Sequence, residues 1–171
     1  MAPPLAVTVW LYAAPTVAAP SDVGVKLMVG AEVVSVYVPE DSGPPTQHGT
    51  GLHTTYISGP GNFAADTDFK ADGTTFQWYF LSSVQVMAPA ETFAVVTFGD
   101  SITDGTASTI NGDDRWPDVL DRRLRAAYGN QVAVVSAGIG GNQVVGPAVY
   151  PPPKPFPGGP SALSRLERDV L

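Results

Sequence analysis

Residues 93–105 read FAVVTFGDSITDG, an apolar run followed at once by a turn of glycine, aspartate and serine. Residues 93–98 have the length and the β-branched content of a buried strand. Gly99 and Gly105 let the backbone turn sharply and let a ligand approach closely. A strand that ends in such a turn presents the hydroxyl of Ser101 at the rim of a sheet, where a nucleophile is useful.

A second strand and a glycine-rich loop repeat this arrangement downstream. Residues 131–135 read QVAVV, and residues 136–142 read SAGIGGN. Residues 115–128, which lie between the two strands, predict a helix with proline in its first turn and a glycine after its last. Strand, helix and strand in this order predict a parallel pair whose two loops leave at the same edge. Backbone N–H groups of the second loop can then point at an oxyanion, each worth about 3 kcal/mol.

A proline-rich loop over residues 150–160 precedes a last predicted helix. Ser161 or Ser164 is expected to cap this helix, and Ser164 with Glu167 fits a capping box. Its expected apolar positions are Leu163, Leu166 and Val170.

The first half of the chain has a different pattern, with short β-branched runs separated by turn residues. The predicted strands are residues 7–12, 23–29, 32–38, 52–58 and 76–87. Frequent short strands are typical of a β-sandwich or a jelly roll. We therefore expect a β-rich module over residues 1–90 and an α/β domain over residues 91–171.

Composition excludes several classes of function. The 171 residues carry a formal charge of −7, so a nucleic-acid partner is not expected. There is no cysteine, which excludes disulfides, and no apolar run is long enough for a membrane span. The spacing of Asp100, Asp104, Asp113 and Asp114 fits no calcium loop. Gln143 stands where a dinucleotide-binding loop would need its last glycine.

The sequences GDSI at 99–102 and AGIGGN at 137–142 resemble the first and second blocks of the GDSL (SGNH) serine hydrolases. The resemblance covers residues 93–171 well and implies the first half of a flavodoxin-like three-layer α/β domain. It implies Ser101 as the nucleophile and the N–H groups of Ser101 and Gly141 as the oxyanion hole, with no cofactor. Asp100 is a possible supporting residue. Asn142 either donates to the oxyanion or satisfies its own loop.

Two elements of this family are not found in the sequence. The third block, Gly-x-Asn-Asp, and the fifth block, Asp-x-x-His, do not occur, so we expect a fragment or a truncated member. The general base is therefore unassigned. His48 and His53 are the only histidines, and either would have to reach Ser101 from the β-rich module or from a neighbouring subunit. A two-stranded parallel sheet also leaves an apolar edge, so we expect a homo-oligomer.

Two functions remain open at this point. The first is an ester hydrolase that acts on a small ester, a lipid or an acetylated carbohydrate, and the family resemblance favours a secreted protein. The second is a non-catalytic module that binds carbohydrate or protein and retains the serine turn as a relic. An imidazole within hydrogen-bond reach of Ser101 would favour the enzyme.

Overall fold

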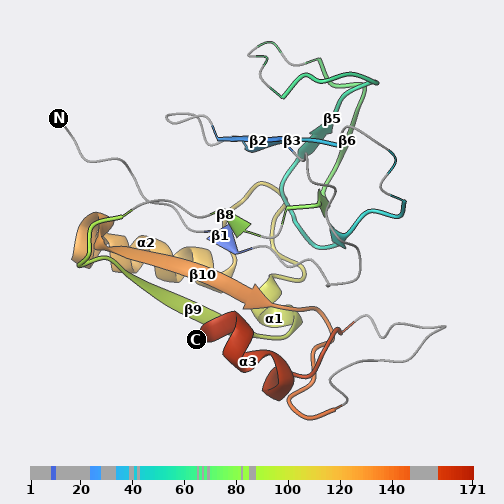
Figure 1. Ribbon diagram of the computed structural model, residues 1–171. Helices are drawn as coiled ribbons and strands as arrows, with labels where there is room; N and C mark the ends of the chain where they lie inside the picture. The colour runs from blue at the N-terminus through green and yellow to red at the C-terminus, as the bar shows by residue number, and fades with distance from the viewer. Residues whose placement is uncertain are drawn as a thin grey trace. The chain divides into compact units, whose positions relative to one another are not determined.

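The chain divides into two compact units, which are described separately. The first, the α/β unit, comprises Met1–Tyr12 and Ser82–Leu171, and the second, the β-rich unit, comprises Ala13–Leu81. The expected boundary near residue 90 stays a prediction. The computed structural model describes residues 9–10, 24–27, 34–38, 41, 43–64, 66, 68, 70–81, 83–84, 88–146 and 158–171 (Figure 1).

Two parallel strands form the centre of the α/β unit. β9 (Phe93–Gly99) pairs with β10 (Val132–Gly138), in a register that sets Val132 opposite Phe93 and Gly138 opposite Gly99. The predicted parallel pair is thus confirmed, and β10 runs three residues further than expected. Because Gly99 and Gly138, the last residues of the two strands, pair with each other, β9 and β10 end side by side.

Burial is concentrated on β10. Its core side chains are Val132, Ala133, Val135 and Ala137. β9 is less covered, since Phe93 is 43% exposed at its start. The buried hydroxyl of Thr97 on β9 donates to the carbonyl oxygen of Val135 at 3.2 Å, which satisfies a polar group inside the pair.

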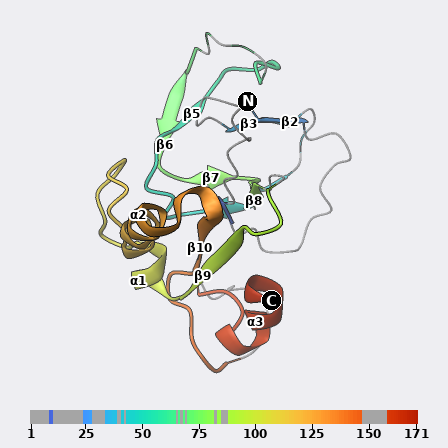
Figure 2. The same ribbon diagram turned by 90° about the vertical axis from the view of Figure 1, so that its left-hand side faces the viewer.

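Helices lie on both faces of this pair. α2 (Trp116–Tyr128) packs against β10, as the sequence predicts, and η1 (Gly129–Gln131) connects the two elements. At the start of α2 the Asp118 carboxylate accepts a hydrogen bond from the N–H of Arg115 at 3.0 Å. Figures 1 and 2 show α3 (Ala162–Val170) on the face opposite α2.

The predicted apolar face of α3 is wrong. Leu163 and Leu166 are 64% and 40% exposed, whereas Arg165 and Asp169 are buried. The predicted capping box is also absent, because the helix begins at Ala162 and the Ser164 hydroxyl donates to the carbonyl oxygen of Ser161 at 2.8 Å. The buried face of this helix is therefore polar.

The described part of the β-rich unit contains antiparallel two-stranded pairs. β2 (Gly24–Leu27) pairs with β3 (Val34–Tyr37), and these strands fall within the two predicted over residues 23–29 and 32–38. The turn between them lies outside the described residues. The other pairs are β4 (Gln47–His48) with β7 (Trp78–Tyr79) and β5 (Thr55–Ile57) with β6 (Gly73–Thr75).

The single strand predicted over residues 76–87 is wrong. It is divided into β7 and β8 (Ser83–Val84), and β8 pairs with β1 (Val9–Trp10) in the α/β unit. Phe80, between them, has φ of +61°, a left-handed conformation that ends a strand. Within the described ranges, no helix has the length and hydropathy that crossing a bilayer requires.

Candidate active site

Ser101 begins a short helix directly after β9. α1 (Ser101–Asp104) is capped by Asp100, whose carboxylate accepts the N–H of Ile102 at 3.0 Å. Gly105, at φ of +100°, ends the helix and donates its N–H to the carbonyl oxygen of Ser101. The Ser101 side chain is partly exposed, and its hydroxyl makes no hydrogen bond to any residue that the structure describes.

α1 lies against the end of β10 because Gly138 has no side chain. A Cβ atom at Gly138 would collide with the backbone of Thr103 and Asp104. The hydroxyl of Ser136, two residues earlier on β10, donates to the carbonyl oxygen of Thr103 at 3.4 Å. The serine turn is therefore placed by the second strand as well as by the first.

The loop after β10 turns back toward the end of β9. Its first N–H, that of Ile139, donates to the carbonyl oxygen of Gly99 at 3.1 Å. The N–H of Asn142 then donates to the carbonyl oxygen of Ile139 at 3.0 Å, with Gly141 at φ of +76° in the turn. The loop after β10 is thus joined by a hydrogen bond to the last residue of β9, at the edge where Ser101 follows.

The side chain of Asn142 connects its loop to the segment before α3. Both hydrogens of Nδ2 are used, since this atom lies 2.7 Å from the carbonyl oxygens of Gly158 and Pro160. The sequence predicts that Asn142 either donates to the oxyanion or satisfies its own loop, whereas its Nδ2 bonds to residues outside that loop. A donor role toward an oxyanion would require one of these two bonds to break.

A buried arginine, which the sequence reasoning missed, joins all of these segments. Arg165 is 0% exposed, and Nη1 donates to the carbonyl oxygen of Ala137 at 2.8 Å. Nη2 donates to the carbonyl oxygen of Gly99 at 3.0 Å and to Oδ1 of Asn142 at 2.9 Å. The guanidinium also lies 4.0 Å from the ring centroid of Phe98, which favours a cation–π interaction.

Asp169 is the charged partner of this arginine. Its Oδ2 lies 2.8 Å from Nη1 of Arg165, and its Oδ1 lies 2.8 Å from Nε of Arg168. Burial lowers the pKa of Arg165 to about 10, so the guanidinium stays charged at neutral pH. Burial also raises the pKa of Asp169 to about 7. The only sequence signal for this pair was its i, i+4 spacing, which is equally typical of an exposed helix face.

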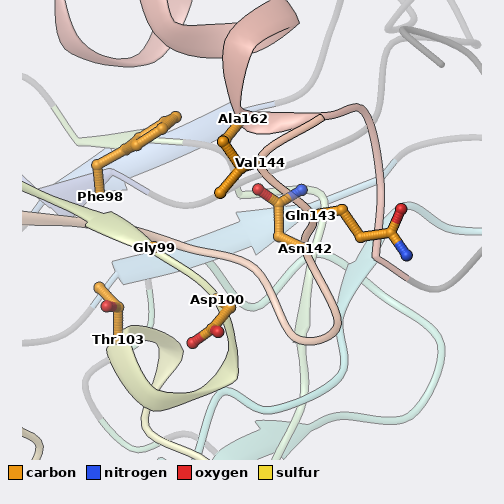
Figure 3. A pocket seen from close by; sticks show the side chains of 8 residues that line it. All are labelled: Phe98, Gly99, Asp100, Thr103, Asn142, Gln143, Val144 and Ala162. Carbon is orange, nitrogen blue, oxygen red and sulfur yellow. The ribbon is translucent and has the colours of Figure 1, made fainter. Parts of the chain in front are cut away.

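A cavity of about 250 Å³ opens between the two loops and the start of α3. In Figure 3, Phe98, Val144 and Ala162 lie on one side and Asp100 and Thr103 on the other, with Asn142 between them. Ser101 is not among the residues that line this cavity. In the described part of the chain, no three carboxylate or imidazole side chains converge as metal ligands.

The two histidines belong to the β-rich unit. Both imidazoles face the indole of Trp78, with ring centroids 5.6 Å apart for His48 and 6.1 Å for His53. Residues 97–171 contain no histidine. The general base therefore stays unassigned.

The fold and the site place the α/β unit in the class of α/β proteins that carry a serine at the carboxyl edge of a parallel sheet. Residues 97–171 match the model of the GDSL-like lipase/acylhydrolase family and form a domain of that family. Membership of this family implies ester hydrolysis. No curated protein matches the chain.

Proposed function

We propose that the chain carries the nucleophile and the oxyanion hole of a serine ester hydrolase. The observation that supports this most strongly is the even register of β9 and β10, which ends both strands at the level of Gly99 and Gly138. Ser101 follows Gly99 at the start of α1, and Gly141 follows Gly138 on the loop after β10. The donors of an oxyanion hole need this kind of fixed backbone placement.

The proposed reaction is a double displacement. The Ser101 hydroxyl attacks the ester carbonyl carbon and passes its proton to a base, and the N–H groups of Ser101 and Gly141 stabilise the oxyanion. The alcohol leaves with a proton from that base, which gives an acyl-Ser101 ester. Water then attacks this ester, releases the carboxylic acid and restores the serine.

The proposed substrates are small esters, lipids and acetylated carbohydrates. The proposed fold is a partial three-layer α/β domain that follows a β-sandwich module. Asp100 supports the serine turn through the cap of α1. Within this sequence the only imidazoles that can serve as the base are His48 and His53.

The test compares the hydrolysis of p-nitrophenyl acetate by the purified chain with that by Ser101→Ala. Ser108→Ala is the matched control, because Ser108 lies shortly after the same turn and its N–H bonds to Gly105. The proposal predicts that activity is lost in the first variant and kept in the second. His48→Gln and His53→Gln then identify the base by a loss of the same size.

Equal background rates in the unmodified chain and in Ser101→Ala would contradict the proposal. The non-catalytic binding module would then be the better explanation, because a serine without a base retains only the effect of the oxyanion hole and of binding.

A further inference from the structure

A single nitrogen of Arg165 connects the end of β9, which precedes Ser101, with the loop after β10. Nη2 donates to the carbonyl oxygen of Gly99 at 3.0 Å and to Oδ1 of Asn142 at 2.9 Å. Gly99 precedes Ser101 by two residues, and Asn142 directly follows Gly141. The two proposed oxyanion donors are therefore each within two residues of a group that one guanidinium holds.

The remaining bonds of Arg165 fix this guanidinium in place. Nη1 donates to the carbonyl oxygen of Ala137 and to Oδ2 of Asp169, and Nε lies 3.1 Å from Oδ1 of Asn142. The ring of Phe98 lies against the guanidinium, with its centroid 4.0 Å from Cζ. Five donors in a rigid planar fork are specific to arginine, since a lysine ammonium presents three donors on a point charge. The side chain is fully buried, so water does not compete for these acceptors.

The loop that this arginine holds is also restrained through Asn142, whose Nδ2 donates to the carbonyl oxygens of Gly158 and Pro160. Gly140 and Gly141 add no side-chain packing, and Gly141 has φ of +76°. The first turn of α3 gives further bonds, from Ala162 N–H to Gln143 and from Leu163 N–H to Val144. These bonds hold residues 143–144 to α3, whereas Arg165 is the side chain that also reaches Gly99 on β9.

We infer that Arg165 is a positioning residue, which sets the separation of the Ser101 and Gly141 N–H groups by bonding at once to Gly99 and Asn142. This inference rests on the proposed function, because it concerns the oxyanion donors of that same site. Productive geometry tolerates displacements of only about 0.5 Å. A substitution that frees the loop should therefore slow the chemical step without weakening substrate binding.

The first experiment measures amide hydrogen exchange by NMR in Arg165→Lys, with Arg168→Lys as the matched control. Arg168 lies on the same helix, is 48% exposed at its side chain and bonds to the same Asp169. We expect the amides of Ile139 and Asn142 to exchange at least about tenfold faster in Arg165→Lys and at the original rate in Arg168→Lys. Slow amides in β10 should not change. Unchanged exchange at residues 139 and 142 in a folded Arg165→Lys chain would overturn the inference.

A second pair of variants decides the question if Arg165→Lys does not fold. Asn142→Asp keeps the oxygen that accepts from Arg165, and Asn142→Ala removes it. Both variants lose the donors to Gly158 and Pro160. We expect faster exchange at Ile139 in the alanine variant than in the aspartate variant, and equal exchange in the two would refute a role for the bond to Arg165.

Kinetics separate positioning from simple stability. With p-nitrophenyl acetate, Arg165→Lys should lower kcat by about 10- to 100-fold and leave KM within about threefold. An equal kcat in an active chain would contradict the inference. If the unmodified chain shows no hydrolysis that depends on Ser101, the proposed function fails, and the exchange rates still decide whether Arg165 holds the two loops.

Discussion

Arg165 donates from both Nε and Nη2 to Oδ1 of Asn142, at 3.1 and 2.9 Å. The two residues come from different elements, a buried helix face and the loop after β10. Their contact joins α3 to the edge of the sheet where Ser101 lies. The buried polar side chain of Arg165 therefore bonds to the segments that adjoin the candidate site.

The buried pair of Arg165 and Asp169 gives a stability prediction. Arg165→Met should lower the free energy of unfolding by about 3–5 kcal/mol, because it leaves the buried carboxyl of Asp169 and the carbonyl oxygens of Ala137 and Gly99 without this donor. Adding Asp169→Leu should recover at least about 1 kcal/mol, since an apolar pair replaces the ionic one. Urea denaturation at constant m-value measures both changes. A double variant as unstable as Arg165→Met would be inconsistent with this explanation.

Gly138 gives a prediction about close packing. Gly138→Ala should destabilise the chain by about 3 kcal/mol, because the new Cβ meets the backbone of Thr103 and Asp104. Gly140→Ala is the matched control, since its Cβ finds only ordinary contact, 3.7 Å from Oδ2 of Asp104. Denaturant midpoints compare the two variants. Equal midpoints would show that α1 does not depend on this glycine.

Asp114 gives a prediction about pH. The Thr109 hydroxyl donates to Oδ2 of Asp114 at 2.6 Å and the Thr109 N–H to Oδ1 at 2.9 Å, and these bonds lower the pKa of Asp114 below 3.8. A lowered carboxyl pKa favours folding above pH 3.8, and this contribution is lost as the pH falls through the folded-state pKa. Thr109→Val should raise the pKa of Asp114 toward 3.8.

The carboxyl carbon shift of Asp114 in an NMR titration measures this pKa. Ser108→Ala is the control, because it removes a neighbouring hydroxyl that does not bond to Asp114. The same midpoint in Thr109→Val as in the unmodified chain would mean that the hydroxyl bond does not form in solution.

The edge of β9 gives a prediction about association. In the part of the chain that the structure describes, β9 pairs with β10 alone, and Ala94 on β9 is exposed. An open edge strand favours pairing with a second copy, so sedimentation should detect a dimer or a larger species. Ala94→Lys should shift the population toward monomer. A monodisperse monomer before this substitution would contradict the expected homo-oligomer.

The elements with strong local signals were predictable from the sequence. β9, β10 and α2 follow from β-branched runs, a proline in the first turn and a closing glycine, and the parallel pairing follows from connection rules. The break within residues 76–87 was not predictable, because it depends on the left-handed conformation of Phe80.

The buried face of α3 was not predictable for a different reason. A charged pair at i, i+4 is usually solvated. Here the pair is buried because carbonyl oxygens at the ends of the two strands accept hydrogen bonds from Arg165. These acceptors, on Ala137 and Gly99, are 28 and 66 residues away from Arg165. A pattern in the local sequence cannot predict contacts between residues so far apart in the chain. The serine turn, in contrast, was visible because its motif consists of contiguous residues.

The most direct test of the proposed catalysis is to trap the acyl-enzyme. The chain is mixed with p-nitrophenyl acetate, quenched in acid within the first turnover, digested and mapped by mass spectrometry, with Ser101→Ala in parallel. We predict an acetyl group on Ser101 in the unmodified chain and none on the corresponding peptide of the variant. An unmodified Ser101 during measurable hydrolysis, or acetylation elsewhere that persists in Ser101→Ala, would contradict the assignment of Ser101 as the nucleophile.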